Sequence, residues 1–275
     1  MSGISKLSVA IADTIAEQNA FVVFRGFEES VRKASQMGYT GVELALCRAD
    51  EIDMASLDAV LARYNMEVSA ISTGQVFARL GYYLSHPDSA NRDAAVEVLS
   101  DLVRLAKRYG KIMNIGRARG FVGEDQTLEQ ADALVMEGIK KIVDVAEAQQ
   151  VDIIIEPLNR YETNYLNTLD ECADFIRRVG SKRVGMMPDT FHMNIEDAHI
   201  GDSLIRNKEF VKYIHIADSN RRAPGWGHLD FDDVFAAIDT MQFDGWISVE
   251  ILPLPDPDSA AKQAVDFVRQ RYWTS

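Results

Sequence analysis

The chain has 275 residues, a formal net charge of −13 and an ordinary globular composition, with 47% hydrophobic and 26% charged residues. The charge argues against a duplex nucleic-acid partner, because no run of lysine and arginine is long enough to offset repulsion by phosphates. No stretch approaches the roughly 18 consecutive apolar residues of a membrane span. The N-terminus lacks a secretion-signal pattern, and the two cysteines, Cys47 and Cys172, lie far apart. We therefore expect a cytoplasmic protein with free thiols and no membrane partner.

An apolar run, a polar turn and an amphipathic helix repeat along the chain. The expected strands are Leu7–Ile11, Gly41–Leu46, Glu67–Ser72, Ile112–Gly116, Val151–Glu156, Val184–Asp189, Val211–Ala217 and Trp246–Ile251. The expected helices are Phe27–Met37, Met54–Tyr64, Asn91–Arg108, Leu128–Gln149, Leu169–Arg178, Phe231–Asp239 and Ser259–Arg271, with a short one at Ile200–Asn207. Thr127 is placed to cap a helix start, and Gly38, Gly110 and Gly180 to follow helix ends.

Eight such units predict an α/β fold, a single (β/α)8 TIM barrel that spans residues 1–275 as one domain. The strands are continuous apolar runs, as expected for parallel strands that are covered on both sides. An open, doubly wound sheet is the alternative. That fold is disfavoured because no glycine-rich phosphate-binding fingerprint follows the first strand.

Four expected strands in the second half end in side chains that bind metals. Glu156, Asp189, His215 and Glu250 follow apolar runs and are separated by 33, 26 and 35 residues. Neighbouring strands lie roughly 5 Å apart, and barrels of this kind carry their sites at the carboxyl ends of the strands. These four side chains can therefore converge on one ion. Three carboxylates and an imidazole favour Mn²⁺ or Mg²⁺, with Co²⁺ tolerated and Zn²⁺ as an alternative.

The segments around these residues carry a family resemblance. They read EPLNRYET from Glu156, DTFHMNIE from Asp189, HIADSNR from His215 and VE at Glu250. Together they resemble the sugar isomerase/epimerase branch of the xylose-isomerase-like TIM-barrel superfamily, above all ketose 3-epimerases of the tagatose/psicose type. The resemblance is tight between Glu156 and Glu250, and elsewhere it extends only to the order of the strands.

The resemblance implies an isomerase and a mechanism. The four strand-end residues would bind one divalent metal, and Glu156 and Glu250 would also form the acid/base pair. Glu162, His192 and Arg221 would contact the sugar near its carbonyl end. A ketose, ketose phosphate or keto sugar acid would lose a proton to give a metal-bound cis-enediolate, whose reprotonation completes epimerisation or aldose–ketose isomerisation. Dimers and tetramers are common in the family, so a homodimer or homotetramer is expected.

The first half departs from the ketose 3-epimerases. The segments Ser72–Gln75, STGQ, and Gly116–Gly120, GRARG, resemble a branch that includes 5-keto-L-gluconate epimerase and L-ribulose-5-phosphate 3-epimerase. Arg117 and Arg119 are candidates to grip a carboxylate or phosphate in bidentate fashion. Pairing of one or both with acidic residues of this acidic protein remains the alternative. If either arginine faces the pocket, we expect an anionic ketose or keto acid as the substrate.

Other functions share parts of this pattern. A dehydratase or lyase on the same scaffold also begins with removal of a proton beside a carbonyl. Endonuclease IV-like repair enzymes share the barrel, but they use several Zn²⁺ ions and many histidines, whereas this chain has five histidines. A non-catalytic sugar-binding protein is the third alternative, and it would not need two glutamates beside the metal.

Overall fold

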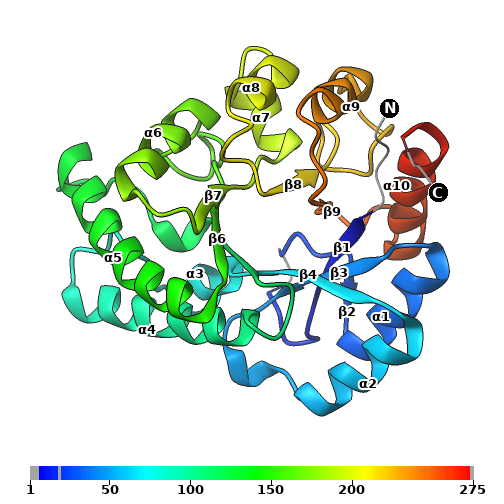
Figure 1. The fold of residues 1–275 in the computed structure, drawn as a ribbon, viewed down its shortest axis with the longest axis horizontal. Helices are drawn as coiled ribbons and strands as arrows, with labels where there is room; N and C mark the ends of the chain where they lie inside the picture. The colour runs from blue at the N-terminus through cyan, green and yellow to red at the C-terminus, as the bar shows by residue number, and fades with distance from the viewer. Residues whose placement is uncertain (1–5, 18–19, 273–275) are drawn as a thin grey trace.

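The computed structural model describes residues 6–17 and 20–272. Parallel strands lie toward the middle of the molecule and helices surround them, as Figure 1 shows. The strands are β1 (Leu7–Ala12), β2 (Phe24–Arg25), β3 (Gly41–Ala45), β4 (Glu67–Ser72), β5 (Ile112–Ile115), β6 (Asp152–Ile155), β7 (Val184–Met186), β8 (Tyr213–Ile216) and β9 (Trp246–Val249). Short β2 pairs only with β1, so the other eight strands are the eight that the sequence predicts.

These eight strands form a nearly closed barrel in the order β7-β6-β5-β4-β3-β1-β9-β8. Two isolated parallel bridges, Met186 with Val211 and Asp189 with His215, connect β7 to the segment of β8. The predicted TIM-barrel fold is therefore confirmed. Because all eight strands run in one direction, their carboxyl ends meet at one end of the barrel.

The helices are α1 (Phe27–Met37), α2 (Met54–Tyr64), α3 (Gly74–Leu80), α4 (Ser89–Ala106), α5 (Leu128–Gln149), α6 (Leu169–Val179), α7 (Thr190–Glu196), α8 (Ile200–Arg206), α9 (Phe231–Thr240) and α10 (Pro257–Arg271). All predicted helices are present, and α3 and α7 are additional. Both additional helices follow the carboxyl ends of strands, β4 and β7, so they add walls at the end of the barrel that carries the site.

Local signals explain several boundaries. Thr127 caps α5 by accepting a hydrogen bond from the backbone N–H of Gln130, whose side chain bonds back to Thr127. Gly38 ends α1 and Gly180 ends α6, both in the left-handed conformation. Gly110 also has a positive φ, of 76°, but it stands beyond the cap of α4 at Lys107, in the turn into β5.

Large side chains fill part of the barrel. Trp246 and Tyr213 pack with Ala70, Ile154 and Met187 in a buried cluster. The Trp246 ring lies so close to Gly41 that a Cβ there would be 2.7 Å from it. The pocket that is open to a ligand lies at the carboxyl ends of the strands, where Gly116, Glu156 and Glu250 line it.

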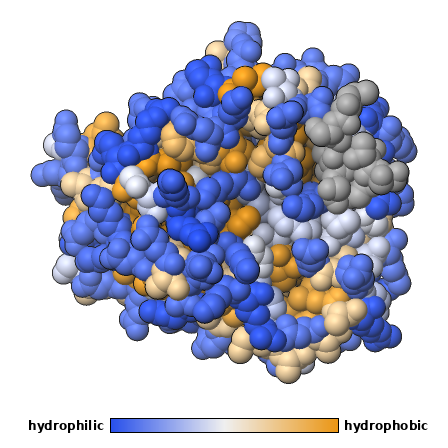
Figure 2. Space-filling view, viewed as in Figure 1, coloured by the Kyte–Doolittle hydropathy of each residue, from blue (hydrophilic) through white to orange (hydrophobic). Residues whose placement is uncertain are grey.

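Toward solvent, hydrophilic side chains dominate the face drawn in Figure 2, with apolar ones in scattered groups. Cys47 and Cys172 are free and buried, as expected. Among the described residues, none of the helices combines the length and apolar character that crossing a bilayer requires.

Candidate active site

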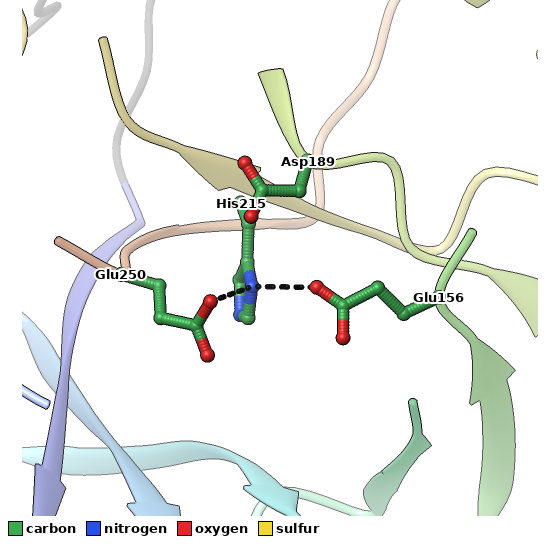
Figure 3. Close-up of side chains that lie close together, drawn as sticks. All are labelled: Glu156, Asp189, His215 and Glu250. Atoms are coloured by element: carbon green, nitrogen blue, oxygen red, sulfur yellow. Dashed lines mark ion pairs between the residues drawn. The ribbon is translucent and has the colours of Figure 1, made fainter. Parts of the chain in front are cut away.

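The four strand-end residues converge at the open end of the barrel. One ligand atom from each of Glu156, Asp189, His215 and Glu250 lies within 4.8 Å of the others. Figure 3 shows the four side chains pointing toward a common centre from neighbouring elements. Nδ1 of His215 is 3.6 Å from Oε1 of Glu156 and 3.6 Å from Oε2 of Glu250. This is the cluster that the spacing of the strand ends predicts.

Local structure orients each donor. Glu156 and Glu250 follow β6 and β9 directly, and His215 lies within β8. Asp189 is the N-cap of α7, where its Oδ1 accepts the backbone N–H of Phe191 at 2.9 Å. The cap uses one carboxylate oxygen and fixes the other, Oδ2, toward the centre of the site.

The cluster fits a divalent cation. Within the described part of the chain, three buried atoms of these four residues have no hydrogen-bond partner: Oε1 of Glu156, Oδ2 of Asp189 and Nδ1 of His215. Buried polar atoms rarely remain unsatisfied in native proteins. Since a metal ion takes lone pairs of this kind, these atoms together with a carboxylate oxygen of Glu250 are the donors that would hold it.

The electrostatics of the cluster also favour a positive charge at its centre. Burial disfavours the charged imidazole of His215, yet Glu43 and Glu250 hold its pKa well above the ordinary value. Burial raises the pKa of Asp189 and raises that of Glu156 to about 7. Burial acts in the same direction on Glu250, but His215 and Arg221 outweigh it and keep its pKa below the ordinary value. The two glutamates therefore differ in proton affinity.

The three residues expected to contact the sugar line the same pocket. Arg221 is buried, forms an ion pair with Glu250 and lies 3.3 Å from Oδ2 of Asp189 through Nη2. Nε2 of His192 is 3.0 Å from Nη1 of Arg221, and burial lowers the pKa of this imidazole so that it is neutral. Glu162 is partly buried, and burial raises its pKa against the positive charge of Arg221. The pocket thus places polar groups of both signs beside the cluster.

The two arginines of the GRARG segment lie in different places. Arg117 lines the pocket, and its guanidinium lies 4.7 Å from the centroid of the Phe77 ring. Arg119 is buried and does not line the pocket. Its guanidinium donates to three backbone carbonyls, those of Gly116 (2.9 Å), Tyr165 (3.0 Å) and Leu166 (3.0 Å). The structure brings Arg117, but not Arg119, to the candidate site.

Two further side chains support the cluster and were not predicted. Glu43, fully buried on β3, accepts from Nε2 of His215 at 2.8 Å and from the hydroxyl of Tyr213 at 2.9 Å. In the neutral imidazole, this hydrogen bond keeps the ring hydrogen on Nε2, so that Nδ1 can offer its lone pair to a metal. Asn114 on β5 donates through Nδ2 to Oε2 of Glu156 at 3.3 Å. A polar side chain inside an apolar strand was the available sequence signal for both.

Comparison with known proteins agrees with this geometry. A family model described as "Xylose isomerase-like TIM barrel" matches residues 31–271. The chain belongs to this family. Among its relatives, the D-psicose 3-epimerase of Agrobacterium fabrum is 30% identical over 233 residues, which cover 82% of this chain and 78% of that protein. The L-ribulose 3-epimerase of Methylomonas sp. is 26% identical, over 90% of this chain and 92% of that protein. The expected resemblance is confirmed.

Solved structures in the family share the fold. The D-psicose 3-epimerase of Clostridium cellulolyticum H10, crystallised with D-tagatose, superposes with a TM-score of 0.83 at 22% identity, covering 98% of this chain and all of that one. The relatives are epimerases, which belong to the isomerase class, so the prediction of an isomerase is confirmed as well. The named relatives therefore support a sugar epimerase.

Proposed function

We propose that the protein is a divalent-metal-dependent epimerase or isomerase that acts on a ketose, a ketose phosphate or a keto sugar acid. The observation that carries the proposal is the cluster of four donors. Their ligand atoms lie within 4.8 Å of one another, and three buried atoms of these residues have no hydrogen-bond partner among the described residues. Two of the four donors are glutamates, which a binding protein would not need for proton transfer. The ketose 3-epimerases among the relatives support the same reaction class.

Mn²⁺ is the ion we expect, because three carboxylates and one imidazole form a hard donor set; Mg²⁺, Co²⁺ and Zn²⁺ are the alternatives. A divalent ion bound there would supply Lewis-acid polarisation of the substrate carbonyl. Glu156, Asp189, His215 and Glu250 would hold it. Glu43 and Asn114 would keep two of these side chains in position through the hydrogen bonds described above.

The proton transfers are assigned to Glu156 and Glu250. One glutamate removes the proton from the carbon beside the carbonyl, and the other returns a proton on the opposite face, which inverts that carbon. Return of the proton to the neighbouring carbon instead would give aldose–ketose isomerisation. Arg221, held between the Phe21 and Phe191 rings at 4.0 and 4.7 Å, supplies a fixed positive charge where an oxyanion develops in the enediolate. His192 and Glu162 orient the hydroxyl groups.

Hydrogen exchange from heavy water tests the proposal. The Mn²⁺-loaded protein is incubated in ²H₂O with D-psicose, D-psicose 6-phosphate and a keto sugar acid, and products are followed by NMR. We expect deuterium at the carbon beside the carbonyl, and an epimer or aldose as the product. Loss of water with an unsaturated product would instead indicate a dehydratase.

The variant Glu250→Gln separates catalysis from binding. It should abolish exchange while the protein still binds the sugar, whereas a binding protein would show no exchange even before the substitution. Absence of exchange with every sugar and metal tested would overturn the proposed function. A dimeric or tetrameric assembly and a cytoplasmic location stay predictions.

A further inference from the structure

We propose that the substrate carries a carboxylate or phosphate group and that Arg117 binds it. The inference rests on the proposed function, because it names the class of sugar that the same pocket would take. It concerns a group of the substrate other than the carbonyl and hydroxyl oxygens that react.

Arg117 stands beside the reacting end of the pocket. It begins the short turn Arg117–Arg119 directly after Gly116, at the carboxyl end of β5. Gly116 packs against Glu156 so closely that a Cβ would lie 2.7 Å from its Oε2. The turn therefore starts in contact with a candidate metal ligand, and Arg117 lines the pocket together with Glu156, Glu162 and Glu250.

Glu162 lines the same pocket, and the charge of Arg117 acts to lower its pKa, but Arg117 forms no ion pair within the described residues. No carboxylate there lies within 4.0 Å of its guanidinium. Arg160, which lies in the segment after the carboxyl end of β6, is paired with Glu196 at 2.8 Å. Arg221, the other arginine that lines the pocket, is already paired with Glu250 and Asp189. Arg117 is thus the pocket arginine that is not already in an ion pair among the described residues, and an anionic substrate would compete for its charge only with Glu162, which lies beyond ion-pair distance.

Aromatic packing holds this guanidinium in place without using its hydrogen-bond donors. The Phe77 ring beneath it lies 5.6 Å from the ring of Tyr83 and 6.5 Å from that of Phe121, and the latter two rings stack at 5.0 Å. A stacked guanidinium keeps the N–H groups at its edge free, because the ring covers only its face. A fixed fork of this kind matches two oxygens of a carboxylate or phosphate.

The neighbouring arginine gives a contrast within the same turn. The Arg119 guanidinium donates hydrogen bonds to three backbone carbonyls, so it holds the turn against the segment at Tyr165 and Leu166. Arg117 makes no such contact among the described residues. In addition, the pocket holds the carboxylates of Glu156, Glu162 and Glu250, which repel an anionic sugar. The positive charge of Arg117 on the pocket wall would offset this repulsion in a protein whose net charge is −13.

The test compares matched sugars on the Mn²⁺-loaded protein. D-psicose is neutral, D-psicose 6-phosphate carries a phosphate, and the corresponding ketose with a carboxylate at C6 carries a carboxylate. Binding is measured by calorimetry and turnover as kcat/KM, for the wild type and for Arg117→Met, Arg117→Lys and Arg63→Met. Arg63 is an exposed arginine on α2 that stacks on Tyr64, and it serves as the matched control.

We expect the wild type to prefer one anionic sugar over D-psicose by about 10- to 100-fold, the range of a charge-assisted pair. The preferred anion identifies the phosphate or the carboxylate as the natural group. R117M should abolish the preference, R117K should retain part of it, and R63M should match the wild type. A wild type that prefers D-psicose, or an R117M variant that lowers kcat/KM for all three sugars equally, would overturn the inference.

Failure of the proposed function gives a different result. If no sugar turns over, the proposed reaction is wrong, and binding alone then decides the role of Arg117. Tighter binding of an anionic sugar that is lost in R117M would uphold the anion site. Equal binding of all three sugars, or equal binding by wild type and R117M, would remove it.

Discussion

Replacing Glu43 by Gln should weaken metal binding although Glu43 is no metal ligand itself. Oε2 of Glu43 accepts both from Nε2 of His215, at 2.8 Å, and from the hydroxyl of Tyr213, at 2.9 Å. Both Glu43 and His215 are fully buried, so no water replaces a lost contact. A glutamine can still accept, but it carries no charge, and it must place an NH₂ group where Oε1 now has no partner among the described residues. The variant therefore loosens the orientation and lowers the basicity of His215.

The size of the effect follows from the kind of hydrogen bond. A bond to a charged group contributes about 1.5–3 kcal/mol, and loss of an outer partner of a metal-binding histidine usually costs roughly 10- to 100-fold in affinity. Since about 1.4 kcal/mol corresponds to tenfold, the two ranges agree. We expect the Kd of Mn²⁺ to rise by about 10- to 100-fold in E43Q.

Titration with Mn²⁺, with free ion followed by electron paramagnetic resonance, measures this Kd without requiring turnover. Tyr213→Phe is the matched control, because it removes the other donor to Glu43 and keeps the contact with His215. It should lower stability by about 1 kcal/mol and change the Kd by less than about threefold. A folded E43Q protein with the wild-type Kd would refute the reasoning, and so would a Y213F variant that is weakened as much as E43Q.

Three further predictions concern the site and the core. Gly116→Ala should displace the Glu156 carboxylate, because the new Cβ would lie 2.7 Å from Oε2. We expect kcat of the folded variant to fall by roughly 100-fold, and an unchanged kcat would contradict this contact. Burial raises the pKa of Glu156 from 4.5 to about 7, so the metal-free protein should lose stability as pH rises through this range. The free energy of unfolding is measured with urea, in EDTA, at pH 5 and at pH 8. Its decrease between the two pH values should be about 2–3 kcal/mol smaller in Glu156→Gln than in the wild type, and equal decreases would exclude the shift. Phe175→Ala, in the core of α6, should cost about 3–5 kcal/mol in urea unfolding without changing the Kd of Mn²⁺, and a cost below about 1 kcal/mol would count against tight packing there.

The sequence predicts the elements well where a periodic pattern meets a specific boundary signal. Helices α1, α2 and α5 begin and end at the predicted residues, and the last of them carries the Thr127 capping box. Helices α3 and α7 have only seven residues each, too few to show a helical period. Helix α8 is equally short, but the sequence predicts it as the helix of the unit between the sixth and seventh strands. The sequence pattern indicates a ligand role for Asp189, and the structure shows that the same side chain also caps α7.

The four strand ends were predictable because they are adjacent around the barrel and follow obvious apolar runs. Glu43 was not predictable in the same way. It lies 172 residues from His215 in the chain, and β1 and β9 stand between their strands in the barrel. The contact crosses the interior, so only closure of the barrel creates it. The two arginines were inseparable in sequence for a related reason, since a single short turn sends one toward Phe77 and the other toward backbone carbonyls.

The residues of the candidate metal site and the arginine proposed to bind the charged group of the sugar lie at different positions around the barrel. The candidate metal ligands come from β6 to β9 or the residues that follow them. Glu43 and Asn114, which form hydrogen bonds with two of them, come from β3 and β5. Substitution of Arg117 alters a side chain that forms no hydrogen bond or ion pair with a candidate metal ligand among the described residues. Substitution of Gly116, one residue earlier, presses on Glu156 directly. Specificity for the charge of a sugar can therefore change at position 117 while the reacting centre is kept, and the comparison of R117M with G116A tests that separation within one turn.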